Sequence, residues 1–176
     1  MLRVRVAALL SAMFAVVPAI SGAQTQPLPA VDITAADIQA QLGPARKNAL
    51  PNIRVVDAGG HHVAVGALAR SAGPNQPAAV HDKVSEVYYV LKGGATLVTG
   101  GTLINPKVRP ADSAQVKQQD GPGETGTGID GGASREIKEG DMVIIPAGTP
   151  HWFSKIDGSI SYVVIRIDPG EILALQ

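Results

Sequence analysis

From residue 53 onward, the chain is a succession of short segments rich in β-branched residues, separated by glycine, proline and aspartate. Segments of this length and spacing are typical of antiparallel β-sandwiches and β-barrels. We expect strands over 53–56, 62–69, 84–91, 95–98, 142–145, 151–154 and 159–167. No helical period of useful length occurs among them, so this part of the sequence predicts an all-β domain.

One short helix is expected before that domain. Thr34 is a suitable N-cap, Asp37 follows it with the spacing of a capping box, and Gly43-Pro44 ends the helix after Leu42. We therefore divide this part of the chain into an N-terminal extension, 24–52, which contains the helix, and a β-domain, 53–176.

Residues 1–23 have the layout of a secretory signal peptide. Arg3 and Arg5 give a positive start, an apolar stretch follows, and residues 21–23 are small, as a signal peptidase requires. The apolar stretch is shorter than the roughly 20 residues of a membrane-spanning helix. We expect cleavage after Ala23, a periplasmic or secreted mature protein, and no membrane attachment after cleavage.

Composition narrows the possible chemistry. The chain has 15 basic and 15 acidic residues and no basic run that could follow a phosphate backbone, so a nucleic-acid partner is not expected. It has no cysteine, which excludes disulfides, thiolate nucleophiles and cysteine-ligated metals. A bound metal would need histidine, carboxylate or tyrosine ligands.

A first candidate site segment runs from His81 to Gly93. His81 and Glu86 would face opposite sides of an uninterrupted strand, because side chains alternate with a period of two. They converge only if the chain turns between them, and Asp82-Lys83 is polar enough for a turn. Beyond the turn, Glu86 and Tyr88 share one face of the strand.

A second segment runs from Gly140 to His151. An apolar strand leads into Pro146-Ala-Gly-Thr-Pro150, a stiff reversal that places His151 at the start of the next strand. Aromatic residues follow His151 directly. A histidine held in this way is a better ligand candidate than an ordinary core histidine.

These two segments resemble the two motifs of the cupin superfamily. His81, Glu86 and Gly93 fall on the second histidine, the glutamate and the closing glycine of the first motif. The second motif is matched at Gly140, Pro146, Gly148 and His151. The resemblance covers roughly 53–167 and implies a jelly-roll barrel, also called a double-stranded β-helix, with a divalent metal inside: iron, manganese, zinc, nickel or cobalt.

The chain departs from the family pattern at two positions. Ala79 stands where the first motif has its first histidine, and Lys155 stands where the second motif ends in asparagine. The implied ligand set is therefore His81, Glu86 and His151. Two imidazoles and one carboxylate suit non-haem Fe(II), and equally zinc with an open position for water. Tyr88 or His62 is a possible fourth ligand.

Other residues are expected around the metal. Tyr88 is the candidate general acid or base, with Glu86 beside it. Large side chains suit the wall of a ligand pocket, and an arginine suits a substrate carboxylate; for Arg166 the alternative is a side chain that reaches to the rim. The expected substrate-binding residues are Trp152, Phe153, Tyr162 and Arg166.

Residues 101–134 form a polar, glycine-rich insertion. A connection of this length is either a functional lid or a surface loop without a role. The sequence decides neither this nor the function of the whole protein. The leading expectation is a metal-dependent enzyme acting on a small organic molecule as an oxygenase, lyase or isomerase. The alternatives are a non-catalytic ligand-binding cupin that has lost its metal, and a structural dimer; a homodimer is expected in any case.

Overall fold

The computed structural model describes residues 28–43, 52–73 and 76–176. The predicted signal peptide, 1–23, lies outside these residues. No helix in the described part of the chain is long and apolar enough to cross a membrane.

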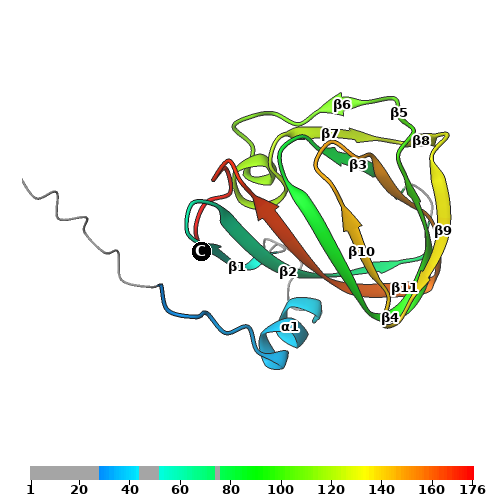
Figure 1. Ribbon diagram of the computed structural model, residues 1–176. Coiled ribbons are helices and arrows are strands. Elements are labelled where there is room, and N and C mark those ends of the chain that lie inside the picture. Colours follow the sequence, from blue (N-terminus) through cyan, green and yellow to red (C-terminus); the bar gives the residue numbers. More distant parts are fainter. Residues whose placement is uncertain (1–27, 44–51, 74–75) are drawn as a thin grey trace, which may run out of the picture.

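The predicted short helix is confirmed as α1 (Ala35–Leu42). The Thr34 hydroxyl accepts a hydrogen bond from the Asp37 N–H at 3.2 Å, and the Asp37 carboxylate accepts one from the Thr34 N–H at 2.9 Å. This reciprocal capping box stabilises the first turn. α1 packs against strands β2 and β1, outside the barrel (Figure 1).

The rest of the described chain is mainly β-structure, which confirms the all-β class. The main sheet has nine strands and curls into a barrel-like shape (Figure 1). Its members are β1 (Asn52–Asp57), β2 (His62–Ser71), β3 (Ala78–His81), β4 (Ser85–Thr99), β6 (Lys107–Val108), β7 (Gly123–Gly126), β9 (Ala133–Lys138), β10 (Met142–Ile145) and β11 (His151–Asp168). A two-stranded sheet of β5 (Thr102–Ile104) and β8 (Gly128–Asp130) accompanies it.

The long strands β4 and β11 organise the barrel. They pair antiparallel with each other over most of their length, and β11 also pairs with β2 and, through His151, with β3. The sequence predicted each as two strands. Gly93 joins the halves of β4 with a φ of 80°, and a side chain there would collide with the Ser159 carbonyl oxygen. Glycine therefore allows β4 to continue where a turn was expected.

The glycine-rich insertion is part of the fold rather than an irregular loop. Strand β7 pairs with β3 and extends the main sheet, and a π-helical segment, η2 (Val116–Asp120), precedes it. Strand β9, whose sequence is polar, is exposed except for Ile137, so its pattern gave no strand signal. The insertion thus brings η2 next to the barrel interior.

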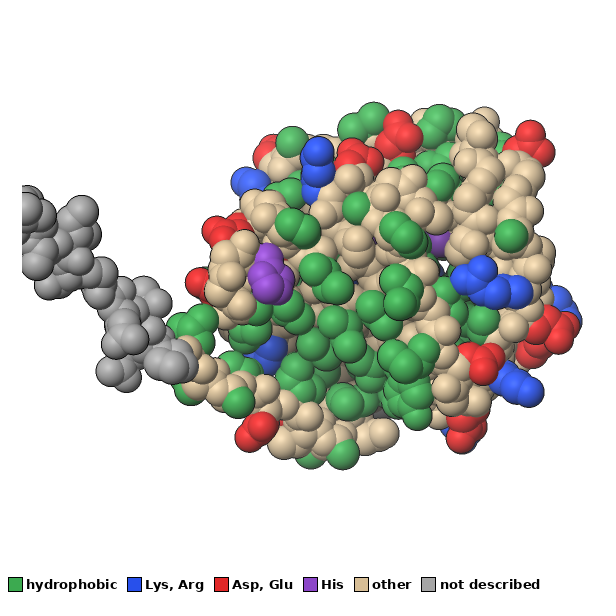
Figure 2. All heavy atoms as spheres, viewed as in Figure 1, with side chains coloured by type: hydrophobic (Ala, Val, Ile, Leu, Met, Phe, Trp, Pro, Cys, Tyr) green, Lys and Arg blue, Asp and Glu red, His purple; other side chains and the backbone are tan. Residues whose placement is uncertain are grey.

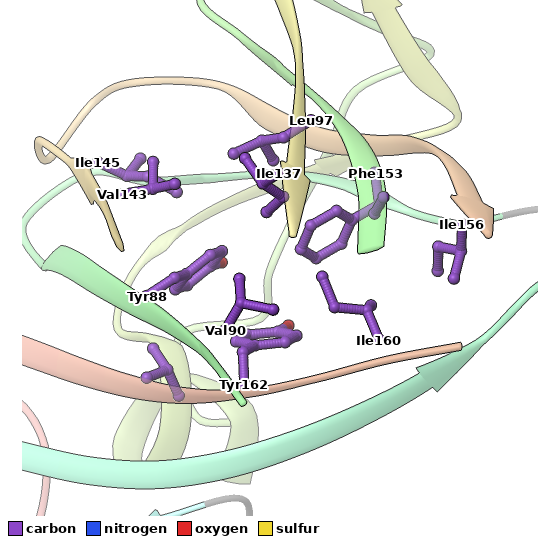
Figure 3. Close-up of a cluster of buried hydrophobic side chains, with 12 residues drawn as sticks. Tyr88, Val90, Leu97, Ile137, Val143, Ile145, Phe153, Ile156, Ile160 and Tyr162 are labelled. Atoms are coloured by element: carbon purple, nitrogen blue, oxygen red, sulfur yellow. The ribbon is translucent and has the colours of Figure 1, made fainter. Parts of the chain in front are cut away.

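Alternation along β4 and β11 fills the barrel interior. The main core cluster contains Tyr88, Val90, Ala95, Leu97, Ile137, Val143, Ile145, Phe153, Ile156, Ile160, Tyr162 and Val164 (Figure 3). Burying one of its larger apolar side chains contributes roughly 1.5–3 kcal/mol. Figure 2 shows hydrophobic side chains gathered on the outer face of the sheet. Tyr89 on β4 and Met142 and Ile144 on the neighbouring β10 are exposed.

Candidate metal centre

The two histidines and the glutamate come together inside the barrel, as the spacing of the motifs predicts. His81 is the last residue of β3, and the chain bends at Asp82 and Lys83 before β4 delivers Glu86. His151 opens β11 after the proline-rich reversal. The Gly148 N–H donates to the His81 carbonyl oxygen at 2.7 Å, which ties that reversal to the end of β3.

The three side chains are buried and face one another. The Nε2 atoms of His81 and His151 lie 3.4 and 3.5 Å from the same oxygen, Oε2 of Glu86. The imidazole centroids are 5.0 Å apart, and the candidate ligand atoms all lie within 4.8 Å of one another. Two imidazole nitrogens and a carboxylate oxygen in this arrangement form one side of a coordination shell and leave the opposite side open.

The protonation of His151 suits a metal ligand. Burial lowers the pKa of His151 to about 4, so the imidazole is neutral at neutral pH. Its Nδ1 lies 3.1 Å from the Thr149 carbonyl oxygen, and a proton on Nδ1 donates to it. The Nε2 lone pair is then directed at the cluster, which is the tautomer that a metal requires.

Glu86 carries the negative charge of the site. Burial alone would raise the pKa of this carboxyl, but the charge of Arg166, followed by that of His81, holds its pKa well below the ordinary range. Buried His81 contributes a further observation, because its Nδ1 has no hydrogen-bond partner in the described chain. A carboxylate oxygen and two imidazole nitrogens fit a divalent cation, and the His81 nitrogen that faces Glu86 is Nε2 rather than the unpartnered Nδ1.

Arg166 does not reach the rim, because it is buried; it lines the cavity, and its role in binding a substrate stays a prediction. Arg166 is only 3% exposed, and Nε lies 2.9 Å from Glu86 Oε1 in an ion pair. Its Nη1 donates to Asn52 Oδ1 at 2.7 Å and its Nη2 to Asp120 Oδ1 at 3.2 Å. The guanidinium therefore makes its contacts with other side chains of the protein, and it holds the carboxylate of Glu86 in position.

The sequence analysis missed two residues of this network. Asp120, at the end of η2, accepts from Arg166 and also from Gln115 Nε2 at 2.9 Å. Asn52, the first residue of β1, is 3% exposed and donates to the Gln118 carbonyl oxygen at 2.8 Å. Neither has a local signal in the sequence, because each reaches the site through contacts between distant segments.

Tyr88 lies where strand alternation predicts, on the face of Glu86. Its hydroxyl donates to Glu86 Oε2 at 2.8 Å. Burial, and next the charge of Glu86, raise the pKa of Tyr88 well above its ordinary value, so the phenol stays protonated. This disfavours a phenolate as fourth ligand and a base role, and it suits a hydrogen-bond donor or general acid.

Only one of the three expected aromatic pocket residues lines the cavity. The ring centroid of Tyr162 is 4.7 Å from that of Tyr88, and Tyr162 borders the cavity (Figure 3). Phe153 packs behind both tyrosines, with centroid distances of 6.2 and 5.6 Å. Trp152 points away from the cavity, because it alternates with His151 and Phe153 along β11; its Nε1–H donates to the Gln76 carbonyl oxygen.

The structure also shows where the remaining candidate ligand position and the two departures from the family pattern lie. His62 is not a ligand in this arrangement, because its Nδ1 lies 2.7 Å from the Leu173 carbonyl oxygen, apart from the cluster. Lys155 is exposed and pairs with Asp157. Ala79 is the register partner of His151 and lines the cavity, so the lost histidine leaves open space beside the three donors.

The cavity over the three donors is small, with a volume of about 60 Å³. Pockets for drug-sized ligands have volumes of about 300–1,000 Å³. The described residues that line it are Leu68, Arg70, Ala79, His81, Glu86, Tyr88, Gln119, Asp120, His151, Tyr162 and Arg166. It therefore suits a metal with a ligand of a few heavy atoms.

No protein-family model matches the chain, and no curated protein matches it. Among solved structures, a Bacillus halodurans protein is similar with a TM-score of 0.44 and 14% identity, over 80% of this chain and 83% of that one. A Bacteroides fragilis cupin protein has a TM-score of 0.35 and 17% identity, over 67% and 74% of the two chains. The DMSP lyase of Ruegeria pomeroyi has a TM-score of 0.41 and 19% identity, over 76% and 55%.

At these identities and TM-scores, neither a family nor an activity follows from the likeness. The sheet topology and the convergence of both motifs on one interior site agree with the resemblance found in the sequence. The chain is a double-stranded β-helix in which the two segments that resemble the cupin motifs meet at one interior site.

Proposed function

We propose that this protein is a metal-dependent enzyme that acts on a small organic molecule. The observation that carries the proposal is the meeting of His81, Glu86 and His151 around a buried, open-sided point beside a cavity of about 60 Å³. A divalent metal bound there supplies a Lewis acid, or activates dioxygen if it is iron. Oxygenase, lyase and isomerase chemistry all remain compatible with this donor set.

The protein's own groups prepare the site for that chemistry. Arg166 and Tyr88 hold the two oxygens of Glu86 in place, at 2.9 and 2.8 Å, so that the carboxylate does not need to reorganise when it binds a cation. Tyr88 borders the cavity with its proton donated to Glu86, and it would donate to an oxygen of the substrate by exchanging that hydrogen bond. The three donors are buried and the cavity over them is small, so little water screens these interactions.

A non-catalytic ligand-binding protein is the second candidate. Ala79 at the position of a family ligand is the observation that favours it, because three protein donors bind a metal less firmly than four. Under this alternative the cavity binds a small molecule and releases it without chemical change.

The two candidates differ in turnover. The full-length mature protein is stripped with a chelator, reloaded separately with Fe(II), Mn(II), Co(II), Ni(II) and Zn(II), and incubated with mixtures of small organic acids and alcohols. Oxygen uptake and proton NMR of the mixture then report consumption. The proposal expects consumption that requires metal and is lost in His151→Ala; stoichiometric binding without consumption under every metal supports the binding protein instead.

Export and dimerisation remain part of the proposal. The layout of residues 1–23 supports cleavage after Ala23 and a periplasmic or secreted location. The exposed apolar side chains of Tyr89, Met142 and Ile144 on the outer sheet face support a homodimer. Mass spectrometry of the exported protein tests the first, since the mature chain should begin at Gln24, and light scattering of wild type and Ile144→Lys tests the second.

A further inference from the structure

Arg70 is the cation of the cavity that the metal cluster does not use. It lies near the end of β2, is half-buried, and lines the same cavity as His81, Glu86 and His151. Two contacts fix its side chain. Its Nε donates to the Tyr162 hydroxyl at 3.0 Å, and its guanidinium carbon lies 5.6 Å from the centroid of the Phe153 ring.

Arg70 differs from Arg166 in its partners. Arg166 is paired with both Glu86 and Asp120, the two carboxylates that line the cavity. Within residues 28–43, 52–73 and 76–176, no carboxylate oxygen lies within 4.0 Å of the Arg70 guanidinium, and Nε makes its one hydrogen bond there. Within this described part of the chain, the terminal Nη groups of Arg70 therefore have no hydrogen-bond or ion-pair partner and are free for a bound ligand.

The charges around the cavity point the same way. Among the described residues that line the cavity, the two carboxylates of Glu86 and Asp120 are matched by the two guanidinium groups of Arg166 and Arg70. A divalent cation bound to the three donors would leave the cavity positive. Such a cavity favours an anionic ligand over a neutral one.

We propose that Arg70 binds the carboxylate of a small organic acid in this cavity and so determines the substrate class of the enzyme. This inference rests on the proposed function for the metal, but the binding by Arg70 is separately measurable. The planar guanidinium presents paired N–H groups that match a carboxylate, and its position is already fixed by Tyr162 and Phe153. The volume of about 60 Å³ limits the acid to a few heavy atoms.

The test uses acetate and its neutral analogue acetamide, at constant ionic strength, with benzoate as an acid too large for the cavity. Calorimetric titration and the shift of the melting temperature report binding to the full chain, both metal-loaded and stripped. The variants are Arg70→Gln and Arg70→Lys, and the matched control is Arg135→Gln, which removes an exposed arginine on β9. Metal content and circular dichroism are measured on every sample.

The expected result is that wild type binds acetate but neither acetamide nor benzoate. Arg70→Gln should weaken acetate binding by roughly 10- to 100-fold, as for loss of a charge-assisted contact. The acetate affinity of Arg70→Lys should lie between those of wild type and Arg70→Gln, and the acetate affinity of Arg135→Gln should equal that of wild type. Equal binding of acetate and acetamide, no acetate binding at all, or unchanged acetate affinity in a folded Arg70→Gln protein would each overturn the proposal.

Failure of the metal proposal gives a different pattern. Wild type that binds no metal yet prefers acetate to acetamide through Arg70 refutes the metalloenzyme and keeps the carboxylate site. Wild type and Arg70→Gln that hold equal metal and bind acetate equally refute the carboxylate site alone. The comparison of acetate with acetamide needs no variant, so the proposal stays testable even if Arg70→Gln does not fold.

Discussion

Replacing Arg166 with methionine should strongly destabilise the metal-free protein. Arg166 is 3% exposed and its guanidinium contacts Glu86, Asp120 and Asn52 at 2.9, 3.2 and 2.7 Å. Methionine keeps much of the apolar stem but leaves two buried carboxylates without their cation. Removing one partner of a buried ion pair costs roughly 3–5 kcal/mol. For a chain of this size, that lowers the melting temperature by roughly 6–20 °C.

Urea denaturation at pH 7, followed by circular dichroism, measures this loss. The difference between variant and wild type should narrow as the pH falls, because Arg166 stabilises only the ionised form of Glu86. Adding Asp120→Asn should cost less in the variant than in wild type, with a coupling of roughly 0.5–3 kcal/mol. Arg135→Met, on the exposed β9, should stay within about 0.5 kcal/mol of wild type. An Arg166→Met protein as stable as that control would refute the buried network.

Three further outcomes are expected. Burial lowers the pKa of His151 from 6.5 to about 4, so the free energy of unfolding of the metal-free protein should fall by up to about 3 kcal/mol between pH 6.5 and pH 4. Urea titrations of His151→Gln should not show this fall. A His151→Gln protein with the same pH profile as wild type would contradict the prediction. Tyr88→Phe removes the 2.8 Å hydrogen bond to Glu86 and should lower the free energy of unfolding by roughly 1.5–3 kcal/mol. In a calorimetric titration, the metal affinity of this variant should be about 10- to 100-fold lower than that of wild type. An unchanged metal affinity would show that Tyr88 does not support Glu86 as a ligand. Ala79→His adds an imidazole opposite His151 and should tighten metal binding in the same titration, whereas Ala79→Leu should not.

The metal cluster could be predicted from the sequence because its determinants are local. The bend at Asp82-Lys83 and the proline-rich reversal before His151 are encoded in the segments that carry the ligands. The position of Tyr88 follows from strand alternation, since it is two residues from Glu86 on β4. These features depend on short spacings, which a single sequence contains.

The role of Arg166 could not be predicted, because it depends on strand register. Arg166 is the register partner of Glu86 in the β4–β11 pair, 80 positions along the chain, and no local pattern specifies that pairing. Asp120 reaches the site because η2 and β7 fold back along β3, and glycine-rich sequence carried no signal for that path. Trp152 was expected in the wall of the pocket because its side chain is large, but the size of a side chain does not tell which face of a strand it occupies.

The central claim is that His81, Glu86 and His151 bind one divalent metal. Elemental analysis of the mature protein, purified without an affinity tag and alongside His151→Ala, tests it most directly. Close to one metal per chain is expected in wild type, with loss of the metal in the folded variant. Wild type that contains no metal, even after anaerobic incubation with divalent ions, would contradict the account and leave a ligand-binding cupin in its place.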